Sequence, residues 1–143
     1  MIRILFILNF FLIAFFLGLH DCSSLEEGSF EIYENDSMVG HIYRKRGWQI
    51  EKYLNGQGQM IATIKSEGCL FYMKSYRVKE DLDTITWAVS YKKIANNHYS
   101  FVGSPKYLKI DYKHFGEIKK ISDDISPDVL ETIKELERSH NDN

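Results

Sequence analysis

The chain has few of the residues on which catalytic and metal sites depend. Only two of its 143 residues are cysteines, and its five histidines are scattered singly, none at a metal-ligand spacing. No serine lies in a nucleophile elbow, and a disulfide between the cysteines would leave no thiol nucleophile. We therefore expect no catalytic residue, no metal site, no cofactor and no enzymatic activity. An enzyme would require that folding bring His98 or His114 within hydrogen-bond reach of a carboxylate in a cleft.

Proline is also scarce, and the chain has no excess of positive charge. The chain has two prolines but nine tyrosines and nine phenylalanines, a composition that suits exposed antiparallel sheet. Its formal net charge is −2, whereas a nucleic-acid binder normally carries the opposite sign. Gly56 and Gly58 lack the third glycine and the strand-to-helix context of a phosphate-binding loop. These features exclude nucleic acid and nucleotides from the expected partners.

Residues 1–19 hold the one long apolar run. Arg3 is followed by Ile4 to Leu17, in which Asn9 is the only polar residue. This is the pattern of a secretory signal peptide, and it is short for a membrane span. We expect a secreted or periplasmic protein whose only membrane attachment would be an uncleaved signal or, as a further alternative, a lipid on Cys22.

The two cysteines predict one covalent cross-link. In an oxidising compartment, an even count of two makes a Cys22–Cys69 disulfide the simplest solution. The alternative is a pair of buried free thiols in a reducing compartment. The length remaining after residues 1–19 suits one domain, which we place at 20–138.

Alternating apolar residues predict a mainly β protein. Strands are expected at 28–34, 40–45, 48–54, 60–65, 69–74, 84–94 and 99–102, and one or two more within 107–121. Residues 79–83 are expected to be a loop, and Gly103-Ser104-Pro105 to interrupt pairing. Ser126 and Pro127 mark the start of a C-terminal helix over 127–138, followed by a disordered tail at 139–143. The expected fold is an antiparallel meander or a small lipocalin-like barrel of seven to nine strands.

Two groups of residues are candidate binding sites. If the strands close into a barrel, four large side chains would line a cavity for a ligand: Trp48, Phe71, Met73 and Trp87. The alternative is that these side chains simply fill the core. Arg44 and Arg46, beside Trp48, are candidates for an anionic protein partner, and charges that protect an edge strand are the alternative.

These patterns predict a non-enzymatic binding protein. The first hypothesis is a module that binds a protein partner, and the second is a lipocalin-like carrier of a small apolar ligand. A carrier requires an enclosed apolar cavity of at least ~300 Å³ beside Trp48 or Trp87.

Three short motifs, in order, add a resemblance. Residues 22–30 (Cys-Ser-Ser-Leu-Glu-Glu-Gly-Ser-Phe), an arginine strand leading to Gln49-Ile50-Glu51, and the Gly68-Cys69-x-x-Tyr72 element resemble small secreted proteins of unknown function from Bacteroidetes-type bacteria. Some of those proteins carry a "DNA topoisomerase IV" name, which a chain this short does not support. Family members have a tryptophan where this chain has Ile64. The resemblance covers about residues 21–112 and implies a β-rich domain with a disulfide, without an activity.

Overall fold

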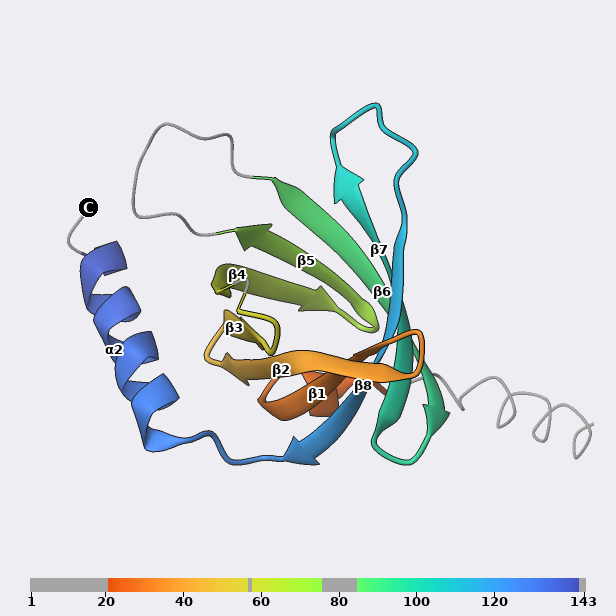
Figure 1. Cartoon of the computed structure of the whole chain (residues 1–143). Helices are drawn as coiled ribbons and strands as arrows, with labels where there is room; N and C mark the ends of the chain where they lie inside the picture. The colour runs from red at the N-terminus through yellow and green to blue at the C-terminus, as the bar shows by residue number, and fades with distance from the viewer. Residues whose placement is uncertain (1–20, 57, 76–84, 142–143) are drawn as a thin grey trace, which may run out of the picture.

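The computed structural model describes residues 21–56, 58–75 and 85–141, which form an eight-stranded antiparallel barrel with one C-terminal helix (Figure 1). The strands, in chain order, are β1 (Gly28–Glu34), β2 (Ser37–Lys45), β3 (Trp48–Tyr53), β4 (Gln59–Glu67), β5 (Leu70–Ser75), β6 (Thr86–Ala95), β7 (His98–Lys106) and β8 (His114–Ser122). A short 3-10 helix η1 (Ser23–Leu25) precedes them, and α2 (Pro127–Asn141) follows. The predicted β-rich class and the barrel alternative are confirmed.

The sheet closes because β1 pairs with both of its neighbours. β1 is hydrogen-bonded to β2 on one side and to β8 on the other, and every other strand pairs with the next one along the chain. Closure removes the exposed edges that an open sheet would present. Alternation then sends every second side chain inward, so that Phe30, Ile42, Phe71, Val89 and Ile118 share one core.

One end of the barrel is closed by η1. Leu25 is fully buried there, and a disulfide joins Cys22 beside η1 to Cys69 in the turn between β4 and β5, with their Cα atoms 5.1 Å apart. The predicted cross-link is confirmed. Because the Sγ atom of Cys22 is bonded to Cys69, it is not the free thiol that lipidation requires. The opposite end, where the β1–β2 turn and the β7–β8 loop lie, is here called the open end.

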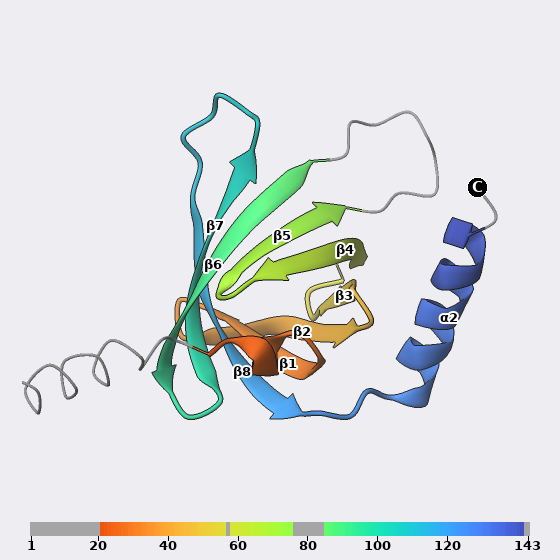
Figure 2. The same cartoon turned by 180° about the vertical axis from the view of Figure 1, so that it is seen from behind.

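A second apolar cluster lies outside the barrel. Val129, Ile133 and Leu136 of α2 pack on Trp48 and Ile50 of β3. Figures 1 and 2 show from opposite sides that the ribbon of α2 lies outside the barrel. The inference that Trp48 would line a cavity is therefore corrected. The apolar face of β3 points outward to the helix, and its polar face, with Gln49 and Glu51, points into the barrel.

Besides shifts of one to three residues at several strand ends, the elements differ from the sequence expectation in three larger ways. The 107–113 segment is a loop, and only β8 follows it. β7 continues through Pro105, which still pairs with Trp87 of β6 but lies beyond Gly103, the last residue paired with β8. A missing N–H is tolerated where no partner strand needs it.

The third difference is the C-terminal helix. It continues to Asn141 rather than Arg138, so residues 139–141 are helical and not a disordered tail. Two contacts stabilise this last turn: Ser139 donates to the Leu136 carbonyl oxygen, and the His140 ring meets the Trp48 ring edge-on at 5.9 Å. The expected signal peptide at 1–19, the loop at 79–83 and residues 142–143 lie outside the described residues. Within the described ranges, no helix combines the length and the apolar character needed to cross a bilayer.

Candidate functional site

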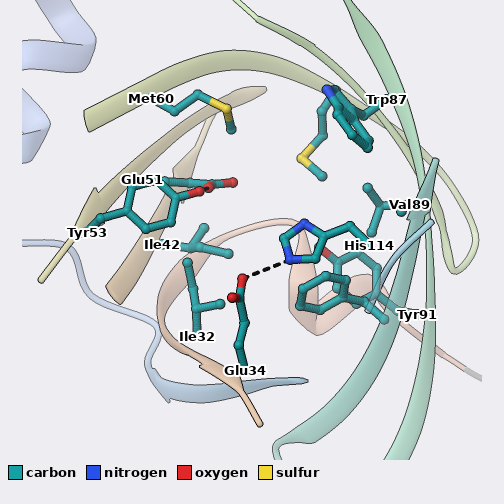
Figure 3. A pocket seen from close by; sticks show the side chains of 13 residues that line it. Ile32, Glu34, Ile42, Glu51, Tyr53, Met60, Trp87, Val89, Tyr91 and His114 are labelled. Atoms are coloured by element: carbon teal, nitrogen blue, oxygen red, sulfur yellow. Dashed lines mark hydrogen bonds and ion pairs between the residues drawn. The ribbon is translucent and has the colours of Figure 1, made fainter. Parts of the chain in front are cut away.

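The barrel encloses a cavity of about 190 Å³ toward its open end. Its walls are mostly apolar, and the polar groups gather on two sides of it, as Figure 3 shows. The described residues that line it are Ile32, Glu34, Ile42, Glu51, Tyr53, Met60, Met73, Trp87, Val89, Tyr91, Phe101, Gly103 and His114. Apolar walls with a few converging polar groups are the usual make-up of a small-molecule site.

A buried cation lies between this cavity and the closed end. Arg44 is fully buried, and its guanidinium donates to Gln49 Oε1 at 2.7 Å, to the Leu25 carbonyl oxygen at 2.8 Å and to the Tyr91 hydroxyl at 2.6 Å. The Phe71 ring lies 4.9 Å from its Cζ. All three hydrogen-bond acceptors are neutral groups, so the nearest compensating charge has to come from elsewhere in the network.

Glu51 supplies that charge across Gln49. The Gln49 side chain accepts from Arg44 and donates to Glu51, and Tyr53 also donates to the Glu51 carboxylate. Burial raises the pKa of Glu51, while its bond from Tyr53 and the nearby Arg44 charge oppose that shift. Burial and the Glu51 charge raise the pKa of the Tyr53 phenol, which keeps it a neutral donor. The cavity wall therefore carries a carboxyl group whose pKa is above its ordinary value because it is buried.

This raised pKa makes the stability contribution of Glu51 dependent on pH. In the unfolded chain the carboxyl titrates near its ordinary value of 4.5. Between that pH and the higher folded-state pKa, the folded protein binds more protons than the unfolded chain, so stability falls as pH rises. The unfolding free energy of the wild type, minus that of Glu51→Gln, should therefore decrease as the pH is raised above 4.5. Urea denaturation of both proteins from acid to neutral pH measures this difference, and a constant difference would contradict the prediction.

A second polar pair lies at the open end of the cavity. His114, the first residue of β8, has its Nε2 atom 2.8 Å from Glu34 Oε1 at the end of β1. Both side chains are partly exposed, at 41% and 36%. In Figure 3 the other ring nitrogen of His114 points away from Glu34 and into the cavity. The carboxylate therefore orients the imidazole and leaves one ring nitrogen for a bound molecule.

The structure separates the six predicted site residues. Met73 and Trp87 line the cavity, whereas Trp48 packs under α2 on the outside. Phe71 belongs to the buried core beside Arg44 and does not line the cavity.

The two arginines lie in different surroundings, Arg44 inside the barrel and Arg46 in the turn after β2. The expectation of an exposed partner-binding Arg44 is wrong: it follows Ile42 by two residues in β2, so it also points inward, where it is fully buried. Arg46 is exposed in the turn after β2 and makes two hydrogen bonds to Glu137 of α2.

Of the polar part of the site, sequence reasoning named only His114, as a conditional candidate, and missed its carboxylate partner and the other polar groups. No sequence spacing indicated that the polar residues would meet, since they come from three strands: Glu34 from β1, Glu51 and Tyr53 from β3, and His114 from β8. The parity of Ile42 and Arg44 was the one usable signal for the buried arginine, because in a strand two residues of the same parity share a face.

Two other features compete with this site. A larger hollow of about 390 Å³ lies along β1, β7 and β8, lined in part by Tyr33, Asp36, Phe115 and Glu117, but it is an open groove on the side of the barrel. His98 also pairs with a carboxylate, at 2.6 Å from Glu117. Neither residue lines the cavity. Across the part of the chain that the structure describes, no three metal-ligating side chains gather as they would around an ion.

No family model, no curated protein and no solved structure matches this chain in comparisons with known proteins. The resemblance to small secreted bacterial proteins therefore stays a prediction, and the function has to be argued from the barrel itself.

Proposed function

We propose that this protein is an exported barrel that binds one small, mainly apolar ligand inside its open end. The observation that carries the proposal is the 190 Å³ cavity, whose wall combines apolar side chains with the Glu51 carboxyl and the His114 imidazole. Eight-stranded barrels have an interior just wide enough to be filled or to hold one small ligand. This is the second hypothesis from the sequence, and the geometry supports it better than the first.

The cavity size restricts the ligand. From the sequence, a carrier of a small apolar ligand was expected to need an enclosed cavity of at least ~300 Å³. The cavity of 190 Å³ falls short of that requirement, so the carrier hypothesis is kept only for a smaller ligand. A cavity of about 150 Å³ holds benzene in an engineered protein. The fitting ligand is therefore one ring, or a chain of similar volume, with a short polar substituent.

The charges on the wall restrict the polar substituent. Glu34 and Glu51 are carboxyl groups, and among the described lining residues there is no lysine or arginine to balance a second anion. A ligand carboxylate would be repelled, whereas an amine or hydroxyl would donate to Glu51 or to the free nitrogen of His114. The proposed class is a single-ring or short-chain molecule with a donor group.

The cellular setting belongs to the same proposal. A disulfide persists mainly in oxidising compartments, which supports a secreted or periplasmic location. Binding of a protein partner remains a prediction, now without Arg44 as a contact, since that side chain is buried.

Titration with benzylamine and with benzoate, two ligands of one ring but opposite charge, tests the proposal. The methyl groups of Met60 and Met73 line the cavity, while Met38 is exposed and outside it, so isotope-labelled methionine methyls report binding by NMR. We expect benzylamine, and not benzoate, to shift the methyl resonances of Met60 and Met73, while the methyl resonance of Met38 stays unchanged. If neither compound shifts the two cavity methyls, the proposed ligand class is wrong.

A filled cavity should abolish this binding. A Cβ atom added to Gly103 would lie 3.4 Å from Val89 Cγ2, in ordinary contact, so the backbone accepts a side chain at this cavity-lining position, and we expect the methyl groups of Gly103→Val to take up cavity volume. We expect this change to weaken benzylamine binding about 10- to 100-fold, because the added side chain takes cavity volume that the ring of the ligand would fill. The neighbouring change Val102→Ile, on the outer face of the same strand, is the matched control and should leave the affinity unchanged.

A second candidate function follows from the His114–Glu34 pair. Folding does bring His114 within hydrogen-bond reach of a carboxylate beside a cavity, the arrangement that an acid–base enzyme would require. Here His114 would transfer a proton at its free ring nitrogen, and Glu34 would hold the ring. Ligand recovered chemically changed after incubation with the wild type, and unchanged after incubation with His114→Gln, would favour this function over simple carriage.

A further inference from the structure

The β7–β8 loop, residues 107–113, is the most exposed apolar segment of the described chain. Eleven large apolar side chains are exposed in the described part of the chain, and four of them lie in this loop: Tyr107 at 82%, Leu108 at 45%, Ile110 at 61% and Tyr112 at 53%. Exposed apolar groups gathered in one place mark an interaction surface more often than chance.

The position of the loop relates it to the cavity. It projects beyond the strands at the open end in both views (Figures 1 and 2). Tyr112 packs edge-on against Trp87, a cavity-lining residue, with ring centroids 6.0 Å apart. At the other end of the loop, Lys106 lies over the Tyr72 ring at 4.1 Å. Both ends of the loop are therefore held against the barrel, and Tyr112 lies beside the cavity wall.

The charge of the loop is opposite to that of the protein. Residues 106–113 contain three lysines, Lys106, Lys109 and Lys113, against one acid, Asp111, while the whole chain has a net charge of −2. Tyrosine and lysine interleaved with leucine and isoleucine suit a water–lipid boundary, because tyrosine has an apolar body with a polar tip and lysine pairs with anionic headgroups.

We propose that this loop docks the open end of the barrel onto an anionic lipid bilayer. Leu108 and Ile110 enter the headgroup region, the two tyrosines lie at its boundary, and Lys109 and Lys113 contact anionic headgroups. The docked cavity then opens toward the bilayer, from which an apolar ligand can enter without crossing water. This surface is additional to any attachment through the N-terminal segment, and it does not depend on the identity of the ligand.

Quenching by brominated lipid locates the contact, even if the N-terminal segment also binds lipid. Ile110→Trp places a reporter in the loop, and Ile94→Trp places one at the closed end, where Ile94 is similarly exposed. Both proteins keep Trp48 and Trp87 as a shared background. The protein is expressed with its N-terminal segment so that the expression host exports it. The vesicles contain brominated phosphatidylcholine, either alone or mixed with phosphatidylglycerol. In the vesicles with phosphatidylglycerol, we expect clearly stronger quenching of Ile110→Trp than of Ile94→Trp, in which only the shared background of Trp87 lies near the docked loop.

Removing the lysines tests the electrostatic part. In the Ile110→Trp background, Lys109→Gln with Lys113→Gln should weaken the vesicle affinity measured by quenching about fivefold per charge. Lys92→Gln with Lys93→Gln removes the same charge from exposed positions in β6, toward the closed end, and should have little effect. Equal quenching at both reporter sites, or no quenching at position 110, would overturn the proposal. If there is no quenching at position 110, a protein partner becomes the better explanation for the exposed apolar loop. Equal quenching without phosphatidylglycerol would overturn the assignment to anionic lipid.

Discussion

Replacing Arg44 with methionine should destabilise the barrel by about 3–5 kcal/mol, the usual cost of breaking a buried, hydrogen-bonded charge network by removing one member. Methionine fills part of the volume but donates no hydrogen bond. The Gln49 side chain, the Leu25 carbonyl and the Tyr91 hydroxyl would each lose a partner. Glu51 would also lose the nearest cation that favours its ionised form. The measurement is the unfolding free energy from urea denaturation at neutral pH.

Arg46→Gln is the control for this experiment. Arg46 is two residues from Arg44 and also pairs with partners far along the chain, but its side chain is 44% exposed. An exposed ion pair contributes about 0–1 kcal/mol, so this change should have little effect on stability.

A double variant separates the charge from the packing. Adding Glu51→Gln to Arg44→Met removes the carboxylate that the first change leaves buried without a cation. The double variant should therefore be more stable than the sum of the two single changes predicts. If Arg44→Met alone is as stable as Arg46→Gln, the buried network does not stabilise the fold and this account of the core is wrong.

Loss of the Cys22–Cys69 disulfide should cost about 4 kcal/mol, by the chain-entropy argument for a loop of this length. The two cysteines are 47 positions apart, so the bond closes β1 through β4 into one loop and restricts the unfolded chain. In the folded state it also holds η1, and with it the Leu25 carbonyl, over the buried Arg44.

The comparison is urea denaturation of the wild type with and without dithiothreitol. The midpoint should fall sharply on reduction, while a Cys22→Ser, Cys69→Ser double variant should be destabilised throughout and insensitive to the reductant. A wild type with the same midpoint in both conditions would contradict the prediction, since the bond would then contribute no stability.

Much of the fold could be predicted from local patterns. Alternation in 28–34 and 84–94 identified β1 and β6 and the inward faces of both, because Phe30, Ile32, Trp87 and Val89 all point into the barrel. Alternation failed in β3, since Trp48 and Ile50 form an apolar face as regular as any other but pack on α2. Periodicity reports that one face is buried and does not say what covers it.

The candidate site was the harder part. Met73 and Trp87 could be selected because they are large and lie in clear strands. Glu34 and His114 are 80 positions apart and meet only because β8 pairs with β1 to close the sheet. Arginine is usually a surface residue, and the burial of Arg44 depends on hydrogen-bond partners from η1, β3 and β6 that no local sequence pattern connects with it.

The sequence alone determined the β-rich class, the C-terminal helix and the pairing of its only two cysteines, because strand period, helix capping and cysteine count are properties of neighbouring residues or of composition. Tertiary structure decided whether the apolar face of a strand such as β3 lines the barrel or packs on α2, where the cavity lies and which polar groups meet in it. Those outcomes depend on closure of the barrel between its first and last strands and on where α2 packs. Both depend on contacts between segments far apart in the chain. An alternating pattern shows that one face of a strand is buried, and only these contacts decide whether that face lies inside the barrel or under α2.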